Sequence, residues 1–347
     1  MIVFGVDAHK RTHTVVAANE AGAQVGCLMV AATTEGHLRL LRWAEAFGLR
    51  RWAVEDCRQL SRLLEADLIR AGERVVRVPP KMMANTRRRA RSRGKSDPID
   101  ALAVARAALA EPDLPAAFLD GPARQLRLLI DCRETLIRQR SAAQSQLRWH
   151  LHELQAGWDP PARSLDLTHT LNTIETRLAD YNSIVADLAR QLLQHIRHLT
   201  CQASDVHTQI SRLVTTVAPH LLSIPGCGPL TAAKLVGETA DIRRFPTPDK
   251  FAMWAGVAPI PVWSGNTPHH RLNRGGNRQA NCALYRIAIT QLRIHPPAQD
   301  YLKRRLAQGN TKPEAIRALK RHLANSIYRN LTLDTATHHT TPQTIAA

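Results

Sequence analysis

Four acidic residues, widely separated in the sequence, have the types and positions that phosphoryl-transfer chemistry uses. Asp7 ends one apolar run and Glu55 ends another, so each carboxylate is expected at the rim of a sheet where a predicted strand stops. Asp97 and Asp100 lie three residues apart at the start of a predicted helix. Because residues i and i+3 project from the same side of a helix, these two side chains can face one point.

Each of these acids also has a purely structural interpretation. An Asp at the end of a strand is commonly just solvated, and Asp97 followed by Pro98 fits a helix N-cap. Capping does not account for Asp100, one turn further on. Asp56 could replace Glu55, but strand alternation points it to the opposite face.

If the two strands are neighbours, the four carboxylates of Asp7, Glu55, Asp97 and Asp100 converge and repel one another strongly. Two Mg2+ ions about 4 Å apart are the usual remedy in phosphoryl-transfer sites. Mg2+ prefers hard oxygen ligands, and the sequence suggests no His/Cys cluster that would compete for this role. We therefore expect a site for Mg2+, with two ions, at this rim. Gly5 would let another backbone or a ligand approach closely.

A second group of residues lies near the C-terminus. Ser264-Gly265 is a turn dipeptide, and most serines in such turns do no chemistry. Here His and Arg residues follow at once, among them Arg271, Arg274 and Arg278, which can contact phosphates or RNA. Ser264 is therefore a candidate nucleophile, which a metal site that polarises the phosphate could help to activate.

Two further stretches are candidates for phosphate contact. The densest basic run directly precedes Asp97 and contains Arg87, Arg88, Arg89, Arg91, Arg93 and Lys95. Such a run is often only a solvated face, but its place beside two acids favours contact with phosphate. Gly226 and Gly228 form a turn that enters a predicted helix and would present free N–H groups to a phosphate, as in helix-hairpin-helix modules. The alternative is a helix–helix turn without a ligand.

Charge and composition indicate the partner. The chain has 347 residues, a formal net charge of +18 and a pI of about 10.6. An excess of positive charge spread over the whole chain favours nucleic acid before membrane as the partner. The six cysteines show no C-x-x-C pair, and no run of about 18 apolar residues occurs. We therefore expect a cytoplasmic, nucleoid-associated protein with neither disulfides nor a membrane span.

The elements that must position these residues follow from periodicity. Three strands are expected within residues 1–30, then a helix at 34–47, a strand at 51–57, a helix at 59–71, a strand at 74–78 and a helix at 97–110. This order predicts a mixed sheet flanked by helices.

Two long helical patterns, at residues 123–156 and 171–217, predict an antiparallel arm or coiled coil. Helices at 279–295 and 312–329 are expected to complete a mostly helical C-terminal domain. The predicted domains are residues 1–115, the arm 116–217, the C-terminal domain 218–330 and a disordered tail 331–347.

Several separated motifs together resemble a known family. They are Gly5-Val6-Asp7-Ala8-His9-Lys10, Ala53-Val54-Glu55-Asp56, Lys95-Ser96-Asp97-Pro98-Ile99-Asp100-Ala101, the stretch from Ala258-Pro259 to Ser264-Gly265, and Arg274-Gly275-Gly276-Asn277-Arg278. The chain is similar over residues 1 to about 330 to DEDD-type insertion-sequence transposases, a family that includes the bridge-RNA-guided recombinases and is related to the Piv and MooV DNA invertases.

The resemblance implies an RNase H-like, RuvC-like N-terminal domain in which Asp7, Glu55, Asp97 and Asp100 hold Mg2+. It also implies that Ser264 attacks DNA to form a covalent phosphoserine link. The two halves of one active site would come from different subunits of a dimer, and dimers would pair into a tetramer. A structured non-coding RNA would guide the choice of both donor and target DNA.

Two other functions stay open at this stage. One is a Mg2+-dependent, junction-resolving nuclease in which water is the nucleophile and Ser264 is only a turn residue. The other is a nucleic-acid binder without activity, although a binder gains nothing from four clustered acids beside DNA.

Overall fold

The computed structural model describes residues 1–55, 60–89, 96–111, 114, 116–117, 121–264 and 267–340. The chain forms two compact units, Met1–Asp120 and Gly121–Ala347. The predicted arm from residue 121 onward and the predicted C-terminal domain both fall within the second unit.

The first unit is built on a five-stranded mixed sheet. Its strands are β1 (Ile2–Ala8), β2 (Thr12–Ala18), β3 (Gln24–Ala31), β4 (Arg50–Glu55) and β5 (Val75–Val78). They lie in the order β3-β2-β1-β4-β5, in which β1 pairs antiparallel with β2 and parallel with β4. The central strand β1 is almost wholly buried, as its continuous apolar run predicts.

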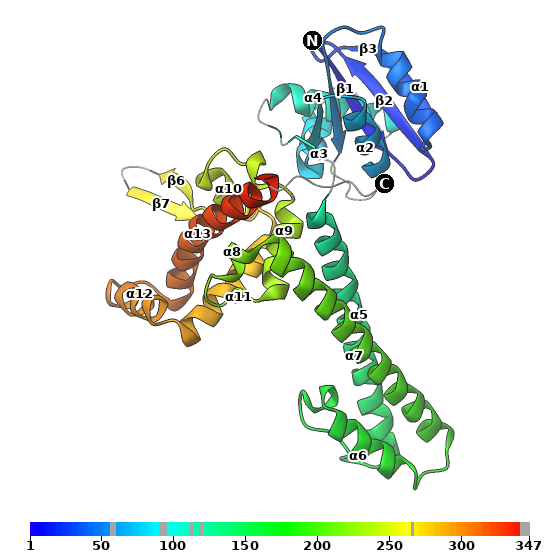
Figure 1. The fold of residues 1–347 in the computed structure, drawn as a ribbon, viewed down its shortest axis with the longest axis vertical. Helices are drawn as coiled ribbons and strands as arrows, with labels where there is room; N and C mark the ends of the chain where they lie inside the picture. The colour runs from blue at the N-terminus through cyan, green and yellow to red at the C-terminus, as the bar shows by residue number, and fades with distance from the viewer. Residues whose placement is uncertain are drawn as a thin grey trace. The chain divides into compact units, whose positions relative to one another are not determined.

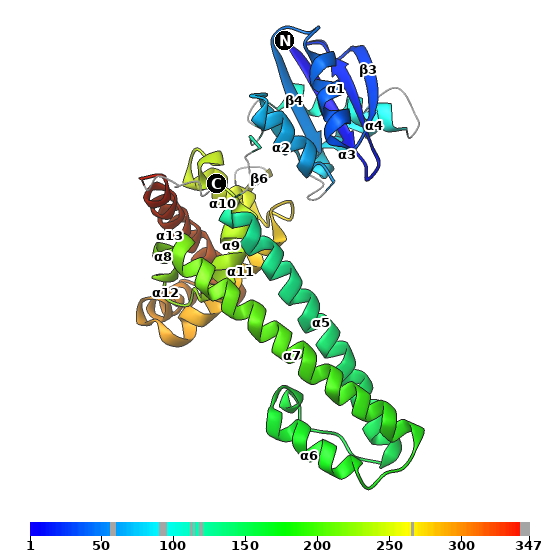
Figure 2. The same cartoon turned by 45° about the vertical axis from the view of Figure 1, so that its right-hand side comes forward.

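Helices cover both faces of this sheet (Figures 1 and 2). Helices α1 (Thr34–Ala44) and α2 (Arg62–Arg70) pack on the face that carries Phe4 and Trp52. Helix α4 (Asp97–Ala110) packs on the opposite face, against Val3 and Ala53. This mixed sheet and its helices form the expected RNase H-like α/β fold.

One helix of this unit was not expected. Residues 79 and 80 were expected to end a strand, and no helix was predicted in the basic run after them. The structure instead places helix α3 (Pro80–Arg89) there. Proline is well tolerated in the first turn of a helix, where its missing N–H is not needed, so Pro80 starts this helix.

Two long helices form the arm of the second unit. Helix α5 (Pro122–Leu154) runs beside α7 (Ile184–Val217), and α6 (Thr168–Leu178), preceded by the short turn η1 (Ser164–Asp166), lies near the end of this pair (Figures 1 and 2). The continuous helical region expected over 171–217 is wrong in one respect, because a break separates α6 from α7. Ser183 lies in this break and caps α7 by accepting a hydrogen bond from the N–H of Ala186 at 3.3 Å.

The rest of the second unit is mostly helical. It comprises α8 (Pro219–Leu222), α9 (Pro229–Thr239), η2 (Ile242–Arg244), α10 (Pro248–Trp254), the hairpin β6 (Ile260–Ser264) and β7 (Thr267–Arg271), α11 (Arg278–Ile294), α12 (Pro296–Ala307) and α13 (Lys312–Thr340). One apolar core joins α9, α10, α11 and α13 with the adjoining ends of α5 and α7.

The predicted disordered tail is wrong for residues 331–340. Helix α13 continues to Thr340 because Leu331 and Asp334 are buried against the core, and Asp334 accepts hydrogen bonds from the N–H groups of His220 and Leu221 at 2.9 and 3.1 Å. Residues 341–347 lie outside the described part of the chain. Among the described residues, no helix has the length and apolar character needed to span a membrane.

Candidate active site

The sheet brings the first two predicted acids together. Strands β1 and β4 are parallel neighbours, with Gly5 opposite Ala53 and Val6 opposite Val54. Asp7 and Glu55 are the next residues on these strands, so both side chains project from the same face, the one that α4 covers. Asp7 is only 7% exposed. Two acids 48 positions apart therefore meet at one rim because their strands share a register.

Helix α4, which carries the other two acids, lies directly on β1. A Cβ atom added to Gly5 would lie 2.0 Å from the carbonyl oxygen of Ala101 and 2.5 Å from the backbone nitrogen of Ala105. The close backbone approach expected at Gly5 is therefore that of α4. The buried alanines of α4, Ala101 and Ala105 among them, make this contact possible because they have no bulk to hold the helix away.

Asp97 and Asp100 lie in the first turn of α4. The N-cap position is Ser96, and Asp97 is the first helical residue, so the capping role considered for Asp97 is not what the structure shows. Its Oδ2 lies 3.7 Å from Nδ1 of His9. Asp100 is buried and accepts a hydrogen bond from Nη1 of Arg87 at 2.8 Å.

The charges around Glu55 shift its pKa. Burial raises the pKa of the Glu55 carboxyl group, and the negative charges of Asp7 and Asp100 raise it further. The charges of Arg87 and His9 act in the opposite direction but do not cancel the effect. Negative charge is therefore in excess at this rim, as in a site that binds cations.

His9 belongs to this cluster, which sequence reasoning missed. Its Nε2 lies 3.9 Å from Oδ2 of Asp7, and the candidate ligand atoms of Asp7, His9 and Asp97 all lie within 4.8 Å of one another. The sequence suggested no His/Cys cluster at this rim, and His9 is a single histidine among aspartates. The signal available was the Asp-x-His spacing after the strand, since the turn between β1 and β2 folds the imidazole back over the rim.

The side chains present suit a hard divalent cation. Two carboxylates and an imidazole, those of Asp7, Asp97 and His9, lie around one point. The carboxyl group of Glu55, whose pKa Asp7 and Asp100 raise, would have its pKa lowered again by a positive charge. A single histidine among carboxylates is acceptable to Mg2+ and even more to Mn2+.

The basic run contributes to this site in a way not anticipated. Arg87 is on α3 and pairs with Asp100, so in this structure it neutralises an acid rather than standing free for phosphate. Arg88 is exposed and donates to Oδ1 of Asn85 at 2.5 Å. The side chain of Arg89, together with Arg91, Arg93, Lys95 and the alternative acid Asp56, lies outside the described residues.

The second predicted site falls on the β6–β7 hairpin of the other unit. Ser264, the first residue of the predicted Ser264-Gly265 turn, is the last residue of β6 and pairs with Thr267 of β7. The Ser264 side chain and residues 265 and 266 are not among those described. Arg271 ends β7 and is exposed.

The Arg-Gly-Gly-Asn-Arg motif connects this hairpin to α11. A Cβ atom on Gly276 would lie 2.3 Å from Cα of Gly256, so glycine is required where the two backbones cross. The side chain of Asn277 caps α11, accepting from the N–H groups of Gln279 and Ala280 at 2.9 Å each. Arg274 and Arg278 are exposed on either side of this crossing.

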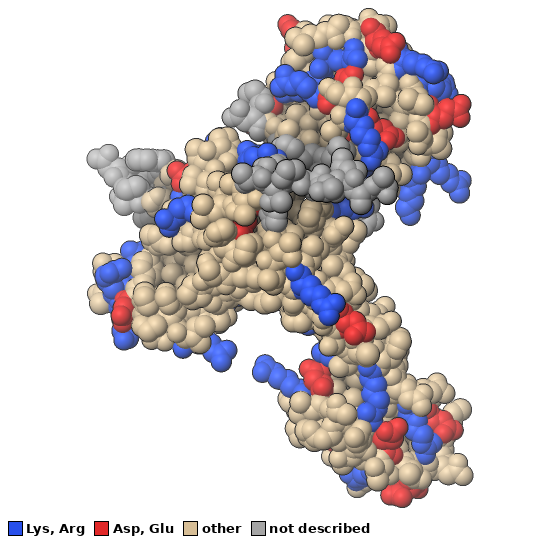
Figure 3. Space-filling model, viewed as in Figure 1, with Lys and Arg blue, Asp and Glu red and all other residues tan. Residues whose placement is uncertain are grey.

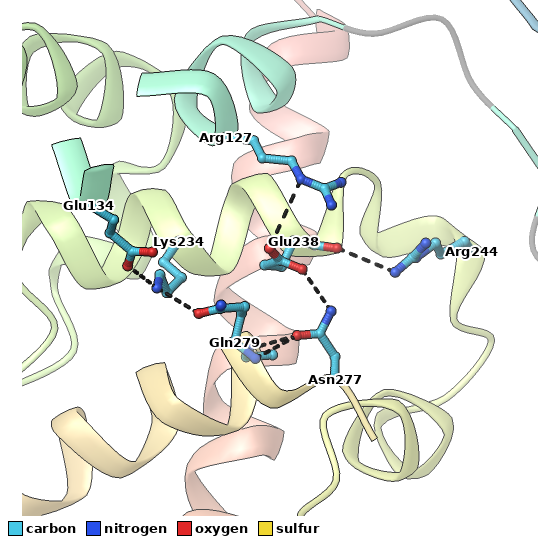
Figure 4. A network of polar contacts seen from close by, with 8 residues as sticks. Arg127, Glu134, Lys234, Glu238, Arg244, Asn277 and Gln279 are labelled. Carbon is cyan, nitrogen blue, oxygen red and sulfur yellow. Dashed lines mark hydrogen bonds and ion pairs between the residues drawn. The ribbon is translucent and has the colours of Figure 1, made fainter. Parts of the chain in front are cut away.

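A buried polar network fixes this motif to the arm (Figure 4). Asn277 donates to Oε2 of Glu238 at 2.7 Å, and Glu238 faces Nε of Arg127 on α5 at 4.0 Å. On the next turn of α9, Lys234 donates to Oε1 of Gln279 at 2.7 Å and pairs with Glu134 of α5. The base of the hairpin loop is therefore held by α5, α9 and α11 together.

The Gly-x-Gly turn enters a helix as expected, but its two glycines differ. Gly226 has φ +80° and is packed against α11, where an added Cβ would lie 3.1 Å from Cβ of Thr290. Gly228 is the N-cap of α9, and nothing would lie within 4 Å of an added Cβ. The N-terminus of α9 is thus open at Gly228, whereas Gly226 has a packing role. The helix before the turn, α8, is only one turn long.

Positive charge is distributed over both units. On the face shown in Figure 3, Lys and Arg side chains lie on the sheet unit, along the arm and on the C-terminal helices. This distribution matches the spread of basic residues along the sequence.

Two family models match separate parts of this chain. A family model described as "Transposase IS116/IS110/IS902 family" matches residues 218–303, which include Ser264, and an IS110 DEDD model described as "Transposase" matches residues 4–155, which include the four acids.

The chain is also similar to individual relatives. It is 25% identical to the 42 kDa protein of insertion element IS900 from Mycobacterium paratuberculosis over 99% of this chain and 98% of that protein. It is 27% identical to the 44.8 kDa protein of IS116 from Streptomyces clavuligerus over 95% and 94%. A pilin gene-inverting protein of Moraxella bovis is 29% identical over 39% of this chain and 44% of its own.

Among solved structures, RuvC of Thermus thermophilus with a Holliday junction substrate matches 31% of this chain and 91% of its own, at 16% identity and a TM-score of 0.25. The sequence matches decide the family: the two models fall on separate parts of the chain, and relatives from insertion elements align with nearly all of it. The chain belongs to the IS110/IS116/IS902 family of DEDD transposases and is a DNA transposase of an insertion sequence.

Proposed function

We propose that this transposase cuts and rejoins DNA with Mg2+ held by Asp7, Glu55, Asp97 and Asp100, and with Ser264 as the nucleophile. The observation that carries the proposal is the convergence of the four carboxylates at one sheet rim, where burial and like charges raise the pKa of Glu55. A structural role alone would not gather four acids there, because their mutual repulsion costs stability.

The metal site would use the carboxylates of Asp7 and Asp97 as its nearest pair, with Glu55 and Asp100 beside them. When bound, Mg2+ would supply positive charge that polarises the scissile phosphate. The side chains have further tasks. Arg87 holds the Asp100 carboxylate in place, and the His9 imidazole lies between Asp7 and Asp97, where it can orient both.

The proposed covalent step is a transesterification at phosphorus. The Ser264 hydroxyl oxygen forms a bond to phosphorus and loses its proton, while the bond from phosphorus to the leaving sugar oxygen breaks and that oxygen takes up a proton. The number of phosphodiester bonds is unchanged, so rejoining needs no further energy source. Ser264 is the last residue of β6 and pairs with Thr267 of β7.

The partners proposed are DNA, a structured guide RNA and further copies of the chain. The net charge of +18 supports a polyanionic partner. The acids and Ser264 belong to two separate compact units, which is compatible with an active site completed by different subunits of a dimer or tetramer. The guide RNA rests on family resemblance alone.

One experiment separates the transposase from a nuclease that uses water. The protein is incubated with DNA of the element ends, the flanking RNA and Mg2+, and the products are run on a denaturing gel. Wild-type protein is expected to give a protein–DNA adduct, and Ser264→Ala is expected to give neither adduct nor rejoined product. Strand cleavage that continues unchanged in Ser264→Ala would show that water is the nucleophile.

A second experiment tests the acids. We expect Asp97→Asn to abolish strand cleavage while nucleic-acid binding survives, because only the negative charge is lost. Glu35→Gln is the matched control, since Glu35 is exposed on α1, across the sheet from this rim. Cleavage by Asp97→Asn at the wild-type level would show that Asp97 is not part of the active site.

A further inference from the structure

A cavity of about 760 Å³ lies within the second unit, and none of its lining residues is a predicted catalytic residue. Its walls come from the turn after α8 at residues 223–225, the C-terminal end of α11, the helix α12 and one side of α13. A cavity of this size falls within the range of small-molecule sites. The function proposed above does not use it.

The polar lining of this cavity is positive. Arg304 and Arg329 are exposed along it, and His295 and His322 also line it, whereas none of the lining residues is acidic. Neither guanidinium group has an acidic partner among the residues that the structure describes. Arginines left without a carboxylate beside a cavity are suited to bind phosphate.

The same cavity offers planar groups and an apolar floor. The ring of Tyr301 lies 5.3 Å from that of His322, at 76° to it, and the guanidinium of Arg304 lies 5.5 Å from the Tyr301 ring centre. Leu319 and Leu323 of α13 contribute apolar surface to the lining. Aromatic rings and guanidinium planes are the surfaces on which unpaired bases stack.

Two carboxamides of the lining are fixed in orientation. Nε2 of Gln291 donates to the carbonyl oxygen of Pro225 at 2.8 Å, and Nδ2 of Asn330 donates to that of Ser326 at 2.8 Å. A carbonyl oxygen can only accept a hydrogen bond, so the NH2 group of each amide must be the end that faces the backbone carbonyl. The remaining amide oxygens are acceptors, which suit the exocyclic amino group of a base.

We propose that this cavity binds a nucleotide of a single-stranded segment, with its base against Tyr301 and its phosphate between Arg304 and Arg329. The inference rests on the proposed action on nucleic acid, but it concerns binding and involves no metal. A single strand of DNA and a single-stranded stretch of RNA offer the same base and phosphate, so both are sources to test.

The test uses the full chain without Mg2+, in EDTA, so that cleavage does not contribute. Binding of fluorescent 12-nucleotide single strands of DNA and of RNA is measured by anisotropy at several salt concentrations. Variants Arg304→Gln/Arg329→Gln and Tyr301→Leu are compared with Lys303→Gln/Arg293→Gln. The control removes two exposed positive charges of α12 and α11 that do not line the cavity. Thermal melting confirms that each variant is folded.

For at least one of the two strands, we expect the double Arg variant to lower the slope of log K against log salt by about 0.7, the value for the one phosphate held between the two arginines. Tyr301→Leu should weaken binding by about 5- to 150-fold, the range found for loss of one stacked base. The control variant Lys303→Gln/Arg293→Gln should change the salt slope and the affinity only as far as the loss of two positive charges elsewhere on the surface does. The strand that responds identifies the source.

A photoreactive base in the responding strand should crosslink to a peptide that contains Tyr301. If the cavity variants behave like the control with both strands, the proposal is wrong. Equal losses with a blunt duplex would refute the base contact. If the proposed catalytic function is wrong, Asp97→Asn will cleave DNA normally. The binding assay in EDTA measures no cleavage, so the two failures are distinguishable.

Discussion

Gly5 gives the sharpest test of how the acidic site is assembled. Adding one methyl group in Gly5→Ala would place a Cβ atom 2.0 Å from the carbonyl oxygen of Ala101 and 2.8 Å from Cβ of Ala105. Since ordinary contact begins at 3.4 Å, α4 would have to move by about 1.4 Å (3.4 − 2.0). The obstacle is backbone, which cannot rotate out of the way as a side chain can.

The magnitude follows from this geometry. Overpacking a core costs about 1–3 kcal/mol, and a backbone clash belongs at the upper end, so we expect a loss of about 3 kcal/mol. For a unit of this size that corresponds to a Tm lower by roughly 10 °C. Moving α4 also displaces Asp97 and Asp100 by about 1 Å, far beyond the roughly 0.2 Å that metal ligation tolerates. Cleavage should fall by at least about 100-fold.

The assay combines urea unfolding, Mg2+ titration by calorimetry and strand cleavage. Gly48→Ala is the matched control, because nothing lies within 4 Å of a Cβ at Gly48 and its φ is not in the left-handed region. We expect this control to match the wild type in all three measurements. A Gly5→Ala protein with wild-type stability and Mg2+ binding would refute the packing of α4 on β1 and with it the assembled site.

Two further predictions concern charge and capping. The folded state raises the pKa of Glu55, so the metal-free protein loses stability as pH rises through that pKa. In EDTA, Glu55→Gln should therefore have a higher Tm than the wild type near pH 7 and the same Tm well below pH 4. The variant should also lack the increase in Tm that the wild type shows on adding Mg2+. A Glu55→Gln protein whose Tm in EDTA near pH 7 is no higher than that of the wild type would contradict this prediction. Asn277→Ala should cost about 2–4 kcal/mol in urea unfolding, because α11 loses its cap and Glu238 loses a donor, whereas Asn277→Ser, which can still cap, should lose about half as much. Equal stability of all three proteins would mean that the cap is not formed.

The sequence by itself determined most of the elements and where the four acids lie on them. The apolar runs that end at Asp7 and Glu55 became β1 and β4, and the helix expected over residues 97–110 has those bounds. Such predictions succeed because periodicity and proline placement act within a few residues of the chain. The arm was predicted for the same reason, although the break before Ser183 was not, since both sides of it carry the same apolar spacing.

The meeting of these elements was decided by tertiary structure. The register between β1 and β4, the crossing of α4 over Gly5 and the fold-back of His9 depend on contacts between residues far apart in the chain, which no local pattern encodes. The pairing of Arg87 with Asp100 is of the same kind, so a residue predicted for phosphate was found bound to an acid. The residue types indicated which chemistry to expect, and only tertiary packing decided which of these side chains lie close to one another.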